Sequence, residues 1–349
     1  MPFRSHTTTR ELARAISRPQ NSLWASVTRS AISRSPTLSA SCRLYSVAST
    51  QRSSAAQRAL LYVPGSNPKQ LAKALGGGLG AAARPAQPDV LILDLEDSVR
   101  TEKKGEARRN VLDALQASSP GQSQRFVRIN SRQLGLDDLE VLLTTPHLQG
   151  LVLPKVDCAR DVQVVDQFIN KYGLDGSKDR LRIIASIESP MALLNLREAS
   201  PFAAEDYCSS SNLIRTPSRR EMLFARSSVV TAAKAYGLKA VDLVCVQYKG
   251  QAAEETLREE SREGRELGFD GKQAIHPAQV EPIQASFTPS DAEIERALKI
   301  LSNYDSLSTA GAGAYGLANQ DGSTSMIDAP MLLQAQGIIA QARAAGVEV

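Results

Sequence analysis

Five charged residues stand at or just after the C-terminal ends of short apolar runs: Glu96, Asp97, Arg128, Glu188 and Asp206. Val, Ile and Leu fill most of these runs, and polar residues come at their ends, a pattern typical of buried parallel strands. Because the carboxyl ends of barrel strands meet at one face, where active sites form, we expect the five side chains to gather there. Carboxylates that outnumber the nearby bases indicate a site for a hard cation.

Glu188 and Asp206 are the predicted ligands of a magnesium ion. Glu188 follows the run at 182–187 and Asp206 follows the run at 202–204, so the two ligands would come from adjacent strands. Magnesium prefers oxygen donors and keeps several waters, and one or two protein carboxylates therefore suffice. Each residue taken alone could be an ordinary surface acid after a strand. Their combination with the other acids favours the metal site.

Glu96 and Asp97 follow an apolar run that already contains Asp94. Three acids so close together repel one another unless a positive charge lies nearby. We predict that Glu96 and Asp97 accept hydrogen bonds from metal-bound waters and fix the orientation of those waters. Asp97 could also cap the helix that follows, with Glu102 in its first turn, and for Asp97 both roles are compatible.

Arg128 lies inside the sequence VRIN, where a buried strand would favour an apolar residue. A guanidinium at this position can bind the carboxylate of an acidic substrate through two parallel hydrogen bonds. A structural ion pair with Asp94 or Glu96 would explain it equally well. The residue alone does not decide between these interpretations.

Three lysines carry weaker signals. Lys155, in the sequence LPKV, also stands at a strand end, and Lys69 and Lys73 follow the turn VPG. Lys69 and Lys73 could contact phosphate groups, although a solvated helix face would explain them too.

The elements that would position these residues alternate between short apolar runs and amphipathic helical stretches from Ala59 onward, which predicts parallel βαβ units. The candidate strands are 59–63, 90–95, 126–129, 150–155, 182–187, 202–204, 241–247 and 272–275. Helices are expected between them, for example at 103–115, 159–172 and 218–236. Eight strands predict an α/β fold of the TIM (β/α)8 barrel type. An open doubly wound sheet would need a glycine-rich turn after the first strand, and VPGSNP offers one glycine.

The sixth candidate strand is truncated. It has only about three apolar residues, and Pro201 stands at its start. A barrel closed by so short a strand could hold Asp206 away from its functional position, and small displacements weaken catalysis.

We expect three regions: a mitochondrial transit peptide at 1–45, a barrel domain at 55–305, and a flexible arm with a C-terminal helix at 306–349. The first region has seven arginines against one acid, and since the chain carries +4 overall, the remainder carries −2. Composition and the sequence RLYSVAS predict import into the mitochondrial matrix, although a plain disordered tail is the alternative.

The rest of the composition excludes several classes of protein. The body of the chain is not basic, so we expect no binding to nucleic acid. No apolar run reaches the roughly 18 residues that span a membrane. The four cysteines form no CxxC pair, which argues against a zinc site or a disulfide framework.

Several motifs in one order resemble the citrate lyase β-subunit family within the HpcH/HpaI aldolase superfamily. The resemblance covers roughly residues 58–290 and is carried by LYVPGSNPKQLAKAL, LILDLEDSVRTEKKGEAR, FVRINS, LVLPKV, SIESPMALLNL, AAEDY, LFARSSVVTAAKAYGLKAVDLV and LGFDGKQAIHPAQV. The C-terminal sequence SMIDAPMLLQAQ further resembles the mitochondrial citramalyl-CoA lyase branch.

The resemblance implies a magnesium-dependent TIM barrel, usually a homotrimer, that makes or breaks a carbon–carbon bond beside a CoA thioester. Glu188 and Asp206 match the magnesium ligands, and Arg128 matches the arginine that binds the substrate. Asp328 matches a catalytic acid that the C-terminal arm of a neighbouring subunit lays over the site. Glu96 and Asp97 match acids that hold the metal-bound waters, and Glu188 and Lys73 are expected to contact the substrate.

The expected reaction cleaves a 3-hydroxy acyl-CoA such as citramalyl-CoA into acetyl-CoA and a small 2-oxo acid, pyruvate. In reverse, the same groups would perform a condensation like that of malate synthase. The alternative, raised by the truncated sixth strand, is a barrel that binds CoA esters or a partner protein without turnover.

Overall fold

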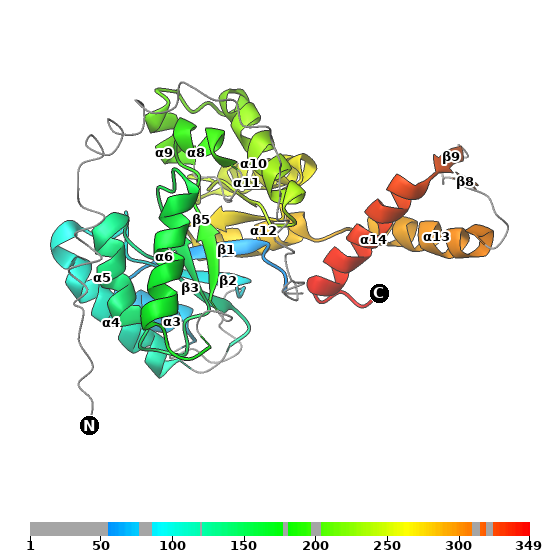
Figure 1. Ribbon diagram of the computed structural model, residues 1–349. Coiled ribbons are helices and arrows are strands. Elements are labelled where there is room, and N and C mark those ends of the chain that lie inside the picture. The colour runs from blue at the N-terminus through cyan, green and yellow to red at the C-terminus, as the bar shows by residue number, and fades with distance from the viewer. Residues whose placement is uncertain are drawn as a thin grey trace, which may run out of the picture.

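One parallel sheet of seven strands forms the centre of the molecule (Figure 1). The computed structural model describes residues 55–76, 86–118, 121–176, 181–196, 204–308, 315–318 and 324–349, so the expected transit peptide at 1–45 lies outside the described residues. The strand order is β5-β4-β3-β2-β1-β7-β6. The strands are β1 (Ala59–Pro64), β2 (Val90–Asp94), β3 (Gln124–Arg128), β4 (Gly150–Leu153), β5 (Arg182–Ala185), β6 (Val241–Asp242) and β7 (Gly271–Ala274).

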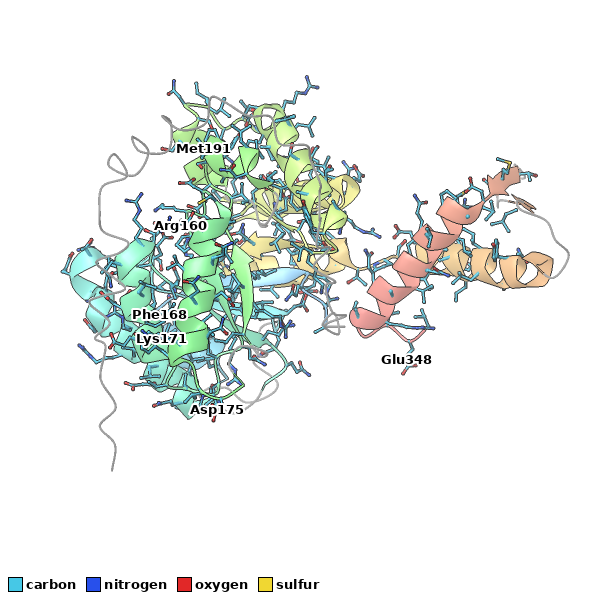
Figure 2. The ribbon with its side chains drawn as sticks, viewed as in Figure 1. Arg160, Phe168, Lys171, Asp175, Met191 and Glu348 are labelled. Carbon is cyan, nitrogen blue, oxygen red and sulfur yellow. The ribbon has the colours of Figure 1, made fainter. Side chains whose placement is uncertain are left out.

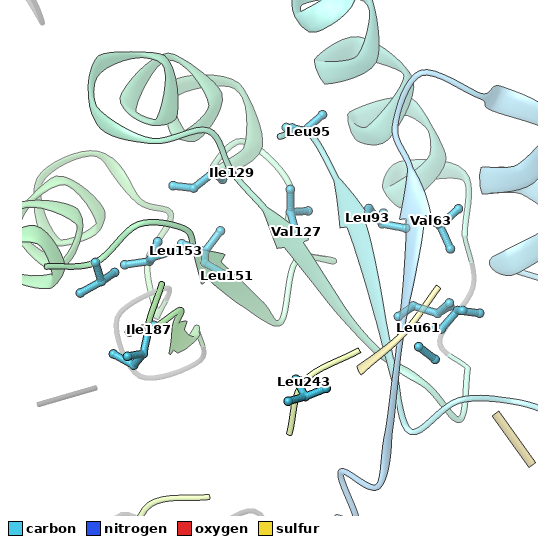
Figure 3. Packing of buried hydrophobic residues seen from close by; sticks show 14 of the residues in the cluster. Leu61, Val63, Leu93, Leu95, Val127, Ile129, Leu151, Leu153, Ile187 and Leu243 are labelled. Atoms are coloured by element: carbon cyan, nitrogen blue, oxygen red, sulfur yellow. The ribbon is translucent and has the colours of Figure 1, made fainter. Parts of the chain in front are cut away.

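The two faces of this curled sheet bury separate sets of apolar side chains, because successive residues of a strand point to opposite faces. Leu60, Ile92, Phe126 and Val152 form a cluster on the inner face. The larger outer cluster packs against the helices, and Figure 3 shows part of it. Its labelled members are Leu61, Val63, Leu93, Leu95, Val127, Ile129, Leu151, Leu153, Ile187 and Leu243.

Helices cover the outer face of the sheet. The helix expected at 159–172 is confirmed with the same bounds as α6, and its Phe168, labelled in Figure 2, is buried in the outer cluster. The barrel helices are α3 (Pro68–Ala74), α4 (Lys104–Ala117), α5 (Arg132–Leu142), α6 (Ala159–Tyr172), α8 (Pro190–Leu194), α9 (Ala204–Ser210), α10 (Leu223–Ala235), α11 (Gln251–Leu267) and α12 (Val280–Phe287). Short 3-10 turns are η3 (Thr101–Lys103), η5 (Arg220–Met222) and η6 (Pro277–Gln279).

The eight-stranded barrel is corrected to a sheet of seven strands within the described residues. Ala204, expected to end the sixth strand, begins α9 instead, while 202 and 203 lie outside the described residues. Strands β5 and β6 are therefore the two edges of the sheet.

The strand expected at 241–247 is also too long, since β6 ends at Asp242. Beyond this point, side chains rather than a neighbouring strand satisfy the backbone carbonyl groups. Arg215 donates to the Val244 carbonyl at 2.8 Å, and Gln279 donates to the carbonyls of Cys245 at 2.8 Å and Gln247 at 3.1 Å. Buried carbonyl groups need such donors when no strand lies beside them.

The C-terminal residues form an arm that lies to one side of the sheet (Figure 1). It consists of α13 (Asp291–Ser308), β8 (Tyr315–Ala318), β9 (Thr324–Ile327) and α14 (Ala329–Ala344). Strands β8 and β9 pair antiparallel within the segment where we expected a flexible arm. The arm has its own apolar cluster, which includes Ile294, Ile300, Ile327 and Ile339. Across the described residues, we find no helix with the length and apolar character that a membrane span requires.

Candidate functional site

Arg128 and Asp94 form the centre of the candidate site. They are register partners at the carboxyl ends of β3 and β2. The Nε and Nη2 atoms of Arg128 donate to the two carboxylate oxygens of Asp94 at 2.6 and 2.7 Å. Although burial alone would raise the pKa of Asp94, the hydrogen bonds and charge of Arg128 outweigh this effect and lower it. The expected ion pair of Arg128 is therefore present, and it uses the Nε and Nη2 donors of the guanidinium.

Asp94 also shapes the loop that carries the next two acids. Its carboxylate accepts hydrogen bonds from the backbone N–H groups of Glu96 at 2.9 Å and Ser98 at 3.2 Å. From α4, the ammonium of Lys104 donates to the carbonyls of Leu95 and Glu96 at 2.7 and 2.5 Å. These bonds hold the loop between β2 and α4 in one conformation.

Glu96 and Asp97 both lie beside Arg128. Its Nη1 atom is 3.1 Å from Glu96 Oε2 and 3.1 Å from Asp97 Oδ2. Lys155, from the loop after β4, places its Nζ atom 2.9 Å from Glu96 Oε1. The alternative role of Asp97 as a helix cap is wrong, because the residue at the N-cap of α4 is Lys103 and makes no side-chain cap.

The pKa of Glu96 is raised from 4.5 to about 7. Burial is the largest cause, since the charged form loses solvation; the charge of Arg128 and the hydrogen bond from Lys155 oppose it, while Asp97 and Glu188 add to it. Beside this pKa, the ion pairs and neighbouring charges place four acids, Asp94, Glu96, Asp97 and Glu188, around two cations, Arg128 and Lys155. An additional cation would be stabilised there.

Glu188 reaches the same end of the sheet after β5, and only 4% of it is exposed. Its backbone carbonyl accepts a hydrogen bond from the Ser210 hydroxyl at 2.9 Å, so α9 is attached beside it. Asp206 lies in α9, one helical turn before Ser210. It thus reaches this region from a helix rather than from a strand end, and its side chain lies outside the described set.

Tyr62 is a site residue that we did not single out from the sequence. The Arg128 guanidinium carbon lies 5.1 Å from the centre of the Tyr62 ring, within range of a cation–π contact. Burial and the negative charges of Asp94, Glu188 and Glu96 raise the pKa of Tyr62, so its hydroxyl stays neutral. Alternation along β1 places Tyr62 on the inner face with Leu60, but the pattern does not reveal which side chain stacks on it.

A cavity of about 300 Å³ adjoins Tyr62. Lys73 from α3 lines it, together with Gln70, Ile275 and His276. This volume lies at the lower end of the range for small-molecule sites. The structure therefore places Lys73 at a cavity that shares Tyr62 with the Arg128 cluster.

Asp328, by contrast, lies outside this cluster. It is the N-cap residue of α14, and its Oδ1 atom accepts a hydrogen bond from the Met331 N–H group at 3.3 Å. It connects β9 to α14 in the arm, whose side chains stand apart from those of the sheet and its helices (Figures 1 and 2). The structure thus places Arg128, Glu96, Asp97 and Glu188 at one end of the sheet. Asp328 of the same chain lies apart from them.

The donor set fits magnesium. Within the described part of the chain, no three His, Cys, Asp or Glu side chains form a group that could enclose a metal ion. Magnesium does not require such a group, because it binds through one or two carboxylates and completes its shell with water and substrate oxygens. The buried carboxylates of Glu96 and Glu188, which interact with each other, would be stabilised by a hard cation beside them.

Comparisons with known proteins show the family of the chain. The family model described as HpcH/HpaI aldolase/citrate lyase matches residues 58–277. The human protein named citramalyl-CoA lyase, mitochondrial, is 33% identical over 306 residues, which cover 81% of this chain and 84% of that protein.

Solved structures of CitE from Mycobacterium tuberculosis share the fold. One, in complex with magnesium, acetoacetate and coenzyme A, has a TM-score of 0.63 at 27% identity and covers 83% of this chain and 99% of that chain. Another, with magnesium and pyruvate, has a TM-score of 0.57 at 25% identity and covers 82% and 99%. Because the family model matches more than half of the chain and the human relative is 33% identical over 81% of it, the chain belongs to the HpcH/HpaI aldolase/citrate lyase family.

Proposed function

We propose that the protein is a magnesium-dependent carbon–carbon lyase that cleaves a 3-hydroxy acyl-CoA ester, with citramalyl-CoA as the preferred candidate and acetyl-CoA and pyruvate as products. The observation that carries the proposal is the buried cluster of Arg128, Asp94 and Glu96, with Glu188 beside it, at the carboxyl ends of adjacent strands. The relatives support the choice of substrate, because one is named for citramalyl-CoA and another binds magnesium and pyruvate.

In this proposal Glu188 and Asp206 hold the magnesium ion, while Glu96 and Asp97 accept hydrogen bonds from its waters. When bound, magnesium supplies positive charge that stabilises oxygen anions of the substrate. Arg128 binds the carboxylate of the oxo-acid half and stabilises the negative charge that develops on the substrate hydroxyl oxygen as the bond breaks. Since Asp94 occupies Nε and Nη2, the substrate contact is made through Nη1.

As the carbon–carbon bond breaks, the hydroxyl proton passes to water and the hydroxyl carbon becomes the carbonyl of the oxo acid. The second product leaves as a thioester enolate, which must gain a proton at carbon. Asp328 is our candidate for the acid that delivers this proton. Its position in the arm supports delivery by a neighbouring copy of the chain, as in a homotrimer. The cavity beside Lys73 would hold part of the CoA moiety, with the ammonium near its phosphates.

The test is turnover of citramalyl-CoA by the purified protein. We expect release of pyruvate and acetyl-CoA that stops on chelation of magnesium and returns when magnesium is added. Glu188→Ala should lower kcat at least 100-fold, because one of the two protein ligands is lost. Equal turnover with and without magnesium would exclude the proposal.

A second candidate function is a barrel that binds CoA esters or a partner protein without turnover. The helix α9 favours it, because Asp206 comes from a helix in place of a strand end. This reading predicts that CoA binds while neither citramalyl-CoA nor acetyl-CoA with pyruvate or glyoxylate reacts. The glyoxylate assay also separates lyase activity from condensation like that of malate synthase.

The same proposal places the protein in the mitochondrial matrix. The arginine-rich composition of residues 1–45 and the mitochondrial name of the human relative support it.

A further inference from the structure

Lys155 stands in a backbone conformation that is unusual for a lysine. It follows β4 and Pro154 with a φ angle of 52°, in the left-handed region that favours glycine. Side chains held in this region cluster at functional sites, where the surrounding structure keeps them in place.

Two hydrogen bonds fix the loop that carries Lys155 to the extension of β5. The Ser186 N–H group donates to the Leu153 carbonyl at 2.8 Å, and the Val156 N–H group donates to the Ser186 carbonyl at 3.3 Å. Ser186 is two residues before Glu188. The strained residue therefore sits in a rigid connection between two strand ends of the candidate site.

This conformation aims the Lys155 ammonium at the acids that also contact Arg128. Its Nζ atom lies 2.9 Å from Glu96 Oε1 and 3.8 Å from Asp97 Oδ1. Arg128 Nη1 lies 3.1 Å from each acid on the other side. The lysine side chain is 47% exposed, so it fills no apolar core.

The arrangement creates a competition for Nη1 of Arg128. Asp94 already takes Nε and Nη2, so Nη1 is the nitrogen that pairs with Glu96 and Asp97. Without Lys155, Arg128 would be the cation that pairs with both acids among the ion pairs of the described residues. A substrate carboxylate would then have to displace them.

We propose that Lys155 is a positioning residue, whose ammonium shares the charge of Glu96 and so weakens the attraction of this acid for Arg128 Nη1, which a substrate carboxylate can then displace more easily. This inference rests on the proposed function, because it assigns the carboxylate of the oxo-acid half to Arg128. It adds a residue that acts through Glu96 and makes no contact of its own with the reacting atoms.

The test measures binding and turnover in Lys155→Met, Lys155→Arg and Lys155→Gly. In Lys155→Met we expect the KM for citramalyl-CoA and the Kd for pyruvate, measured by calorimetry in the presence of magnesium, to rise about 10-fold with kcat changed less than threefold. Lys155→Arg should restore most of the affinity. Lys155→Gly relieves the left-handed backbone and removes the ammonium, and it should match Lys155→Met.

Lys234→Met is the matched control, because Lys234 is 48% exposed and pairs with Asp270 at 2.8 Å on another surface. It should leave both constants unchanged. Unchanged KM and Kd in Lys155→Met would overturn the inference. A wild-type Kd in Lys155→Gly would also overturn it, because this variant lacks the ammonium and would show that the backbone, and not the ammonium, controls the affinity. If the wild type binds pyruvate with this dependence on Lys155 but never turns over, the proposed function fails while the positioning role stands.

Discussion

The guanidinium of Arg128 shows how one residue can satisfy two interpretations of its sequence. Arginine has five N–H donors, and Asp94 engages two of its nitrogens while Nη1 faces Glu96 and Asp97. The sequence places a charged residue at the end of a buried strand and so indicates both an ion pair and a substrate contact. The register of β2 and β3 decides which N–H donors the ion pair uses and which remain for a substrate. No local sequence pattern predicts this register.

We predict that Glu96 makes the proposed magnesium binding depend on pH near neutrality. Its pKa is raised to about 7, so the residue is mostly protonated at pH 6 and mostly ionised at pH 8. Because magnesium binds more strongly beside an ionised carboxylate, we predict that its affinity rises by about 10-fold between pH 6 and pH 8. Calorimetric titration of the metal at several pH values measures this change.

Glu96→Gln is the control for this prediction, since it keeps the shape and loses the ionisation. The rise in magnesium affinity between pH 6 and pH 8 should be largely absent in the variant.

The raised pKa of Glu96 also affects the free energy of unfolding of the metal-free protein. Because the folded state binds this proton more tightly, the contribution of Glu96 to that free energy declines as pH rises from 4.5 through about 7. An affinity that is flat between pH 6 and pH 8 in the wild type would contradict the assignment.

At the scale of elements, the sequence predicts best where a feature is local. Apolar runs located β1 to β5 and β7, and helical spacing located α6 within its observed bounds. It was wrong at Ala204, which begins α9, and it overextended β6, because a short apolar run forms a strand only if a neighbour pairs with it. Whether such a neighbour is present is a property of the whole sheet.

A buried ionic network holds the short strand β6 against α10 and α11. Arg226 Nε and Nη2 lie 3.1 and 2.9 Å from the carboxylate oxygens of Asp242, and Lys272 Nζ lies 3.5 Å from Asp242 Oδ2. All three side chains are fully buried. Gly264 in α11 permits this packing, because a Cβ there would meet Asp242 Oδ2 at 2.5 Å. The network compensates for the few backbone bonds of β6.

Asp242→Asn should therefore destabilise the protein strongly. The change removes the charge that Arg226 and Lys272 share, while Arg226 keeps Glu263 and Lys272 keeps Glu260. We therefore expect a loss at the lower end of the about 3–5 kcal/mol that breaking a buried ion pair costs. Urea denaturation followed by circular dichroism measures the loss. Glu295→Gln, which breaks the exposed pair with Lys299, is the control and should leave the midpoint unchanged. Equal midpoints for the two variants would show that the network contributes nothing to stability.

At the scale of the whole molecule, the arm is a separate packing unit. Its helices α13 and α14 pack on each other around their own apolar cluster, and Asp328 caps α14 away from the sheet. The sequence predicted the C-terminal helix, while the role of Asp328 in catalysis stays a prediction. It could not predict where the arm lies, because this depends on surfaces far apart in the chain.

Mixing two inactive variants tests whether the arm serves a neighbouring subunit. Asp328→Asn lacks the proposed proton donor, and Arg128→Met lacks the substrate-binding guanidinium. If the arm acts on a neighbour, mixed oligomers contain some sites with both residues intact, so activity should return to about 10–30% of the wild type. Activity is measured after the two proteins are co-expressed. No recovery in mixed oligomers, with each variant folded, would show that the arm serves its own subunit.

The place of β1 in the sheet has a consequence for how the chain folds. β1 pairs with β2 on one side and with β7 on the other, so Ala59 lies beside Lys272. During synthesis, β1 can complete its backbone hydrogen bonds only after β7, the last strand of the sheet along the chain, has been made. Pairing between such distant segments is slow, and the unfinished sheet exposes apolar edges meanwhile. One side of β1 therefore stays unpaired during synthesis until residue 272 has emerged.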